Sequence, residues 1–152
     1  MKKLIMCLAL LAACRTTTRV VTTSSPVVTS GNQTGAADAL GAVRGFLAAA
    51  KEQDLQAMGG IFGDAQGAAR DRIPRQELEQ RELFMVRCLR HDRYDIVGDA
   101  PSAGGGRAIA VSLAFKELTR STSFAVVQGP ERRWYVQKFE PSTLQDICVR
   151  RT

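Results

Sequence analysis

AIAVSLAF, at residues 108–115, is the clearest β-strand pattern in this chain. Large apolar residues alternate with Ala and Ser along it, and strict alternation over this length is typical of a strand with one buried face. The other face carries only small side chains, so another layer can pack closely against it. We therefore predict a strand over 108–115.

Three further strands are expected around this one. Tyr94, Ile96 and Val97 indicate a strand before it, and 122–127 and 134–139 indicate two after it. The glycine-rich segment 99–106, a tight turn near 117–119 and the run 128–131 are predicted as the connections. Consecutive strands joined by such short connections predict an antiparallel meander.

Three helices are predicted before the strands. Residues 36–51 carry apolar side chains at three- and four-residue steps, and Asp54 is placed to cap a short second helix. A polar loop over 63–74 leads to a third helix over 75–90, with Glu79 and Glu82 expected on its solvent side among the arginines. At the other end of the chain, Ser142 is predicted to cap a closing helical turn over 143–148.

Helices followed by a meander predict an α+β domain, with a helical hairpin and a third helix packed on a curved four-stranded antiparallel sheet. FLAAAKEQDLQAM at 46–58 and RWYVQKF at 133–139, with the third helix between them, resemble the nuclear-transport-factor-2-like superfamily, which includes polyketide-cyclase-like and ketosteroid-isomerase-like domains. The resemblance covers about residues 36–148 and implies a cone-shaped fold. It implies no single activity, because that fold hosts enzymes, small-molecule binders and assembly modules.

The N-terminus has the parts of an export signal: Lys2 and Lys3, an apolar run over 4–11, and small residues at 12 and 13. The run is too short to span a bilayer as a helix, which takes about 20 residues. Leu11-Ala12-Ala13-Cys14 resembles the lipobox of bacterial lipoproteins. The resemblance implies that residues 1–13 are removed and that Cys14 is acylated.

A lipid-anchored protein of the bacterial cell envelope is the expected product. More than one acyl chain makes membrane attachment durable, and Arg15 after the cysteine implies the outer membrane, facing the periplasm, in a cell with two membranes. Residues 14–35 are rich in Thr, Ser and Val and are predicted to form a disordered tether that reaches about 25 Å. Residues 36–152 have the size of one domain.

Cys88 and Cys148 are the cysteines left if Cys7 is removed with the leader and Cys14 is acylated. An exported chain folds in an oxidising compartment, so these two are predicted to form a disulfide that closes a 60-residue loop. A reactive or metal-binding pair is the alternative, but neither cysteine has a histidine or a further cysteine close by in the sequence.

The charge pattern argues against nucleic acid as a partner. The formal net charge is +6, and removal of Lys2 and Lys3 leaves +4. The arginines are scattered among acidic residues, without the basic stripe and interleaved aromatics of a nucleic-acid surface. Attraction to anionic lipid or envelope polymer is the weaker alternative to simple solvation.

No catalytic, cofactor-binding or metal-binding set stands out in the sequence. His91 lies close to Asp92 and Tyr94, which could supply a base, an orienting carboxylate and a phenol. A histidine at the end of a helix, beside a solvated acid, is the simpler interpretation. Trp134 is a third weak pocket candidate, with core packing favoured.

The leading hypothesis is a non-enzymatic lipoprotein that binds a small apolar ligand or a protein partner in the envelope. The alternatives are an enzyme or degenerate enzyme of the same fold with a buried acid, and a structural module that forms a homodimer through the sheet. A buried acid with a raised pKa would favour the enzyme. A dry apolar cavity would favour the binder, and a broad apolar sheet surface the module.

Overall fold

The computed structural model describes residues 34–149, so the predicted leader, Cys14 and most of the predicted tether lie outside the described residues. The chain forms helices and strands in the order α1, α2, β1, β2, α3, β3, β4, β5, β6 and α4. The helices are α1 (Ala39–Glu52), α2 (Leu55–Ile61), α3 (Arg75–Cys88) and α4 (Gln145–Val149). The strands are β1 (Gly63–Asp64), β2 (Gly67–Ala68), β3 (Arg93–Pro101), β4 (Arg107–Phe115), β5 (Leu118–Gln128) and β6 (Trp134–Phe139).

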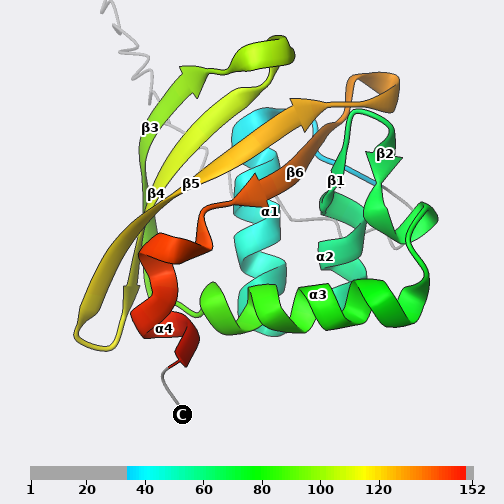
Figure 1. The fold of residues 1–152 in the computed structure, drawn as a ribbon. Helices are drawn as coiled ribbons and strands as arrows, with labels where there is room; N and C mark the ends of the chain where they lie inside the picture. The colour runs from blue at the N-terminus through cyan, green and yellow to red at the C-terminus, as the bar shows by residue number, and fades with distance from the viewer. Residues whose placement is uncertain (1–33, 150–152) are drawn as a thin grey trace, which may run out of the picture.

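The main sheet is an antiparallel meander of four strands in the order β3-β4-β5-β6, which confirms the predicted α+β class. Strand β4 holds Ile109 opposite Phe124 of β5, and Val126 of β5 lies opposite Val136 of β6. These pairs place the large apolar residues of neighbouring strands on one face. Figure 1 shows the sheet curving over α1, with α3 crossing beneath it and α4 beside the end of α3.

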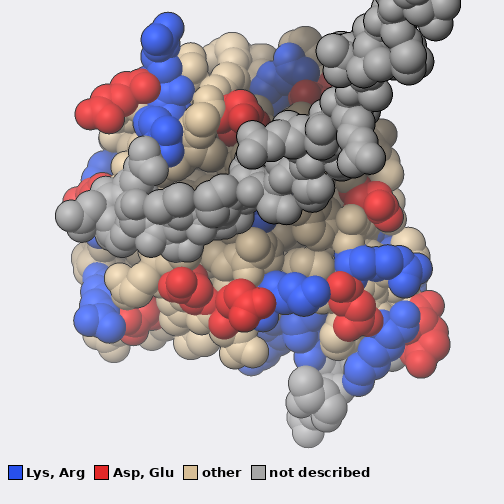
Figure 2. Space-filling model, turned by 180° about the vertical axis from the view of Figure 1, so that it is seen from behind, with Lys and Arg blue, Asp and Glu red and all other residues tan. Residues whose placement is uncertain are grey.

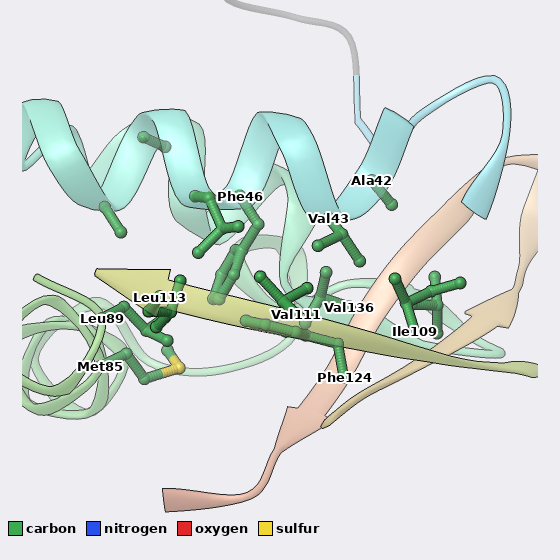
Figure 3. Packing of buried hydrophobic residues seen from close by; sticks show 14 of the residues in the cluster. Ala42, Val43, Phe46, Met85, Leu89, Ile109, Val111, Leu113, Phe124 and Val136 are labelled. Atoms are coloured by element: carbon green, nitrogen blue, oxygen red, sulfur yellow. The ribbon is translucent and has the colours of Figure 1, made fainter. Parts of the chain in front are cut away.

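Helix α1 packs against the apolar face of the sheet, and the two together form most of the core. Asp38 caps its N-terminus by accepting a hydrogen bond from the Gly41 amide, and its C-terminus ends at Gln53 in the left-handed conformation. Figure 3 shows the side chains of α1 packed against those of the sheet, with α3 contributing at one end. Each large side chain buried in this way contributes about 1.5–3 kcal/mol. The fully buried members include Val43, Phe46, Leu47, Ile109, Val111, Leu113, Phe124 and Val136.

The domain begins earlier, and α1 later, than the sequence predicted. Helix α1 starts at Ala39, after the Asp38 cap, and Ala36 instead forms an antiparallel bridge with Trp134. Gly35, assigned to the tether, donates its amide to the carbonyl of Gly60, and its own carbonyl accepts from Arg133. A segment with backbone bonds to two elements belongs to the folded unit.

Three local predictions were wrong. The loop predicted over 63–74 contains the β1–β2 hairpin and a 3-10 turn over Ala69–Asp71. Residues 99–101, predicted as loop, extend β3. The closing turn is capped by the side chain of Glu140, which accepts from the Ser142 amide, and not by Ser142 itself.

A disulfide joins α3 to α4. The sulfur atoms of Cys88 and Cys148 lie 2.18 Å apart, and their Cα atoms are 4.1 Å apart. Arg90 reinforces the contact by donating from Nη2 to the carbonyl oxygen of Ile147 at 2.6 Å. The short C-terminal helix is thereby held against the end of α3.

Charged side chains of both signs are mixed on the surface. In Figure 2, basic and acidic groups alternate along the lower part of the back face. Several form ion pairs, including Arg75 with Glu79 and Arg107 with Asp99. Within residues 34–149, no helix has the length and apolar character needed to cross a bilayer.

Candidate functional site

The α3–β6 pocket is an open hollow of about 500 Å³ between helix α3 and the end of strand β6. This volume is within the range of small-molecule sites. Its walls combine apolar side chains with a rim of polar and charged ones. The lining residues are Phe62, Glu77, Gln80, Arg81, Phe84, Met85, Gln137, Lys138, Phe139 and Pro141.

An aromatic cluster connects this pocket to the core. Phe62 and Phe139 line the pocket, and behind them Phe46 and Phe124 are fully buried. Ring centroids are 5.9 Å apart for Phe124 and Phe139, 6.4 Å for Phe46 and Phe124, and 6.3 Å for Phe46 and Phe62. Aromatic contacts at such distances are favourable. The rings of Phe62 and Phe139 are therefore supported by the buried rings of Phe46 and Phe124.

Helix α3 forms the opposite wall. Phe84 is 51% exposed, an unusually large fraction for an aromatic side chain, and Met85 beside it is nearly buried. Glu77 and Arg81 pair on the same helix at i and i+4, so their charges largely cancel at the rim. Lys138 contributes a cation from β6. The pocket thus offers apolar walls and a polar mouth.

The structure brings together two of the three predicted pocket candidates. The rings of His91 and Tyr94 meet edge to face, with centroids 5.5 Å apart, beside a separate hollow of about 360 Å³. His91 is only 6% exposed and its Nδ1 lies 2.7 Å from the carbonyl oxygen of Leu89. The Asp92 carboxylate accepts the Lys116 amide at 2.7 Å, so it caps a turn. His91 thus lies just after α3, as the simpler interpretation had it, but it is buried.

Trp134 lies far from that pair. Tyr94 is opposite Leu113 of β4, which is opposite Arg120 of β5, whereas Trp134 is opposite Gln128 of β5. Eight residues along a strand span about 26 Å. Trp134 packs against the core, so these three candidates do not form one site.

Glu82 was misplaced by the sequence analysis. It is only 1% exposed, whereas we predicted it on the solvent side of the third helix. Burial raises its pKa to about 7, and the charges of Glu79 and Asp54 add to the shift. Glu82 lies four residues after Leu78 and three before Met85, which puts it on the buried stripe of α3. The helical spacing in the sequence could therefore have predicted its burial.

Glu82 does not line the α3–β6 pocket or the hollow beside His91. Glu82 is therefore not placed to contact a molecule bound in either hollow. Among the described residues, no group of three or more His, Cys, Asp or Glu side chains is placed to hold a metal ion. The α3–β6 pocket is therefore the best candidate site in the described part of the chain.

Comparison with known proteins adds no relative from which a role could be transferred. The α3–β6 pocket must be interpreted from its own residues. No protein-family model, no curated protein and no solved structure matches this chain.

Proposed function

We propose that this protein is a lipid-anchored lipoprotein of the bacterial cell envelope that binds a small apolar molecule in the α3–β6 pocket. The observation that carries the ligand site is the exposure of Phe62 and Phe139 in one pocket, on a base of packed aromatic rings. Rigid aromatic walls bind apolar ligands at little entropic cost, because the rings are already ordered. Lipid anchoring rests on the sequence of the N-terminus.

The pocket suits a planar or chain-like apolar body with one polar end. Such a body would lie between Phe84 on α3 and Phe139 on β6. Its polar end would remain at the rim, close to Gln137 and Lys138, where hydrogen bonds can be made without burying a charge. An anionic end fits best, since Arg81 is already paired with Glu77 and Lys138 adds positive charge.

We assign the domain to the nuclear-transport-factor-2-like fold. The support is the order of elements, a helical hairpin and a third helix before a four-stranded meander, and the curvature of that meander over α1 in Figure 1. Side chains fill the space between α1 and the sheet, as Figure 3 shows for part of the core. The pocket lies between α3 and the end of β6.

Binding of anilinonaphthalene sulfonate tests the pocket, because this probe has a flat apolar body and one anionic group. The chain is exported with Cys14→Ser, which removes the predicted acylation site. Phe84→Ser should weaken binding about fivefold, the loss expected from about 1 kcal/mol of apolar contact. Leu83→Ser is the matched control, because Leu83 is 58% exposed on the same helix but does not line this pocket.

Native mass spectrometry of the same proteins then identifies the natural ligand class. A bound small molecule that is lost in Phe84→Ser and kept in Leu83→Ser supports the proposal. Equal binding of the probe to all three proteins would contradict it. An empty dimer would point to the structural module instead.

One observation favours a second candidate, an enzyme: Glu82 is a buried acid with a raised pKa. Glu82 does not line the pocket, which counts against it, because a general acid must reach the reacting group. A molecule found in the pocket can be incubated with the protein and its mass followed. Conversion that is lost in Glu82→Gln would establish catalysis, and an unchanged mass would leave binding alone.

A further inference from the structure

Two ionisable side chains pack against one pair of glycines where α2 meets α3. A Cβ atom on Gly59 would lie 2.7 Å from Oε1 of Glu82, and one on Gly60 would lie 3.0 Å from Nη1 of Arg70. Any larger residue at either position would therefore displace one of these two ionisable side chains. Glycine is unfavourable inside a helix by about 1 kcal/mol relative to alanine, so the pair at this place makes room for Glu82 and Arg70.

Glu82 is enclosed without full hydrogen bonding. The residue is 1% exposed, and its Oε1 has no hydrogen-bond partner within residues 34–149. A buried oxygen without a partner destabilises the ionised carboxylate more than the neutral acid. The neutral acid is consequently favoured over the carboxylate, in agreement with the raised pKa of Glu82.

The charges around Glu82 are mostly of the same sign. Glu79 on α3 and Asp54 at the start of α2 both oppose its ionisation. Lys51, at the end of α1, donates its hydrogen bond to the carbonyl oxygen of Asp92 and not to Glu82. Arg70 is the cation that packs against the same pair of glycines, Gly59 and Gly60, as Glu82.

Within residues 34–149, the hydrogen bond and ion pair of Arg70 are both long. Its Nη1 lies 3.4 Å from the carbonyl oxygen of Gln56, and its Nε lies 3.9 Å from the Asp71 carboxylate. The Cβ atom of Arg70 lies 3.2 Å from the position that a Cβ on Gly59 would take, the same position that Glu82 approaches. Both side chains thus pack against the same glycine position.

We propose that Glu82 is a proton-dependent switch of the contact between α2 and α3. The neutral acid packs against Gly59. When it releases its proton to water, the carboxylate turns toward Arg70, pairs with it and leaves its place against Gly59, which loosens α2 from α3.

The switch bears on the pocket through both helices. Phe62 directly follows α2, and Met85 lies three residues after Glu82 on α3, and both line the pocket. The contact that Glu82 controls therefore also holds two pocket walls together. This consequence rests on the proposed function, whereas the switch itself does not.

Amide hydrogen exchange tests the switch without any ligand. The exported Cys14→Ser chain, with its disulfide intact, is compared at pH 5.5 and pH 8.5 after correction for the intrinsic pH dependence of exchange. The amides of α2 should open about tenfold more often at pH 8.5, because local opening follows the free energy of the local contact. In Glu82→Gln, which cannot ionise, protection should be the same at both values.

Two further variants separate the switch from a general effect of charge. Glu79→Gln removes a neighbouring carboxylate on the same helix but leaves Glu82, so it should keep the pH dependence. Arg70→Met removes the partner of the ionised state and should raise the midpoint of Glu82, followed by carboxyl carbon NMR. Equal protection of α2 at both pH values in the Cys14→Ser chain, or an unchanged midpoint in Arg70→Met, would overturn the proposal, and neither result depends on ligand binding.

Discussion

Gly35 lies against the ring of Tyr135, so close that a Cβ atom on Gly35 would be 2.8 Å from Cζ of the tyrosine. Gly35 also has a φ of +64°, in the left-handed region that favours glycine. Tyr135 is 2% exposed and shares a hydrogen bond between its hydroxyl and the hydroxyl of Thr34. This contact holds the start of the domain against β6.

Gly35→Ala should destabilise the domain by about 2–4 kcal/mol, the combined cost of left-handed strain and overpacking. Gly104→Ala is the matched control. Gly104 also has a positive φ, of 72°, but an added Cβ would meet nothing within 4 Å. It should lose only about 1–2 kcal/mol from the backbone. Urea unfolding followed by circular dichroism gives both values, and equal losses would show that the tyrosine contact contributes nothing.

The stability of the protein should fall between pH 4.5 and pH 7 because of Glu82. Its folded pKa is about 7, above the ordinary 4.5, so the folded state keeps a proton that the unfolded state releases in this interval. The contribution is complete below pH 4.5 and is lost as the pH rises to 7. A shift of this size corresponds to about 3 kcal/mol.

Subtracting the unfolding free energy of Glu82→Gln from that of the unsubstituted protein at each pH isolates this group. Asp64 gives an opposite slope at acidic pH, since its pKa is lowered, chiefly by a hydrogen bond from Arg72. That slope is present in both proteins and cancels. A difference that stays flat from pH 4 to pH 8 would contradict the assigned pKa.

Loss of the disulfide should cost about 4 kcal/mol in the chain-entropy model, because the bond closes a 60-residue loop. Cys88→Ala with Cys148→Ala removes it without leaving a free thiol, and urea unfolding measures the loss. Intact mass before and after reduction reports the two hydrogens that the bond excludes. Two free thiols in the exported protein would contradict the prediction.

Cys14→Ser should abolish acylation of the protein. The serine hydroxyl does not accept the acyl chains that lipobox cysteines carry, so labelled palmitate should enter the unsubstituted protein alone. Cell fractionation should find the unsubstituted protein with the membrane. Cys7→Ser is the matched control and should still be labelled and membrane-bound. Equal labelling of the Cys14→Ser variant would contradict the lipobox.

Regular periodicity made much of the fold predictable. The alternation at 108–115 lies within β4, and the apolar steps over 36–51 overlap α1, which differs mainly at its start. The β1 and β2 strands were missed because each has two residues, too few for any period. Gly63 and Gly67 in these strands had suggested only a loop.

The candidate site was not predictable in the same way. The α3–β6 pocket is formed by Phe62, two turns of α3 and residues 137–141, which meet only through tertiary packing. Phe139 was expected as a strand residue, and no sequence pattern placed it in one pocket with Phe84. The prediction for Glu82 was wrong for a different reason. A charged residue type favours solvent exposure, but its position on the apolar stripe of α3 decides its burial.

The bond between Cys88 and Cys148 makes a covalent ring of the chain that runs from α3 to α4. All four strands of the main sheet, β3 to β6, belong to that ring. Cleavage of one peptide bond in a hairpin turn, such as that at Lys116 and Glu117, would open the ring without separating the sheet into two molecules. Such a nick would add one water to the mass and leave a single band on a non-reducing gel. A protease that made a first cut in this ring would thus leave the protein in one piece.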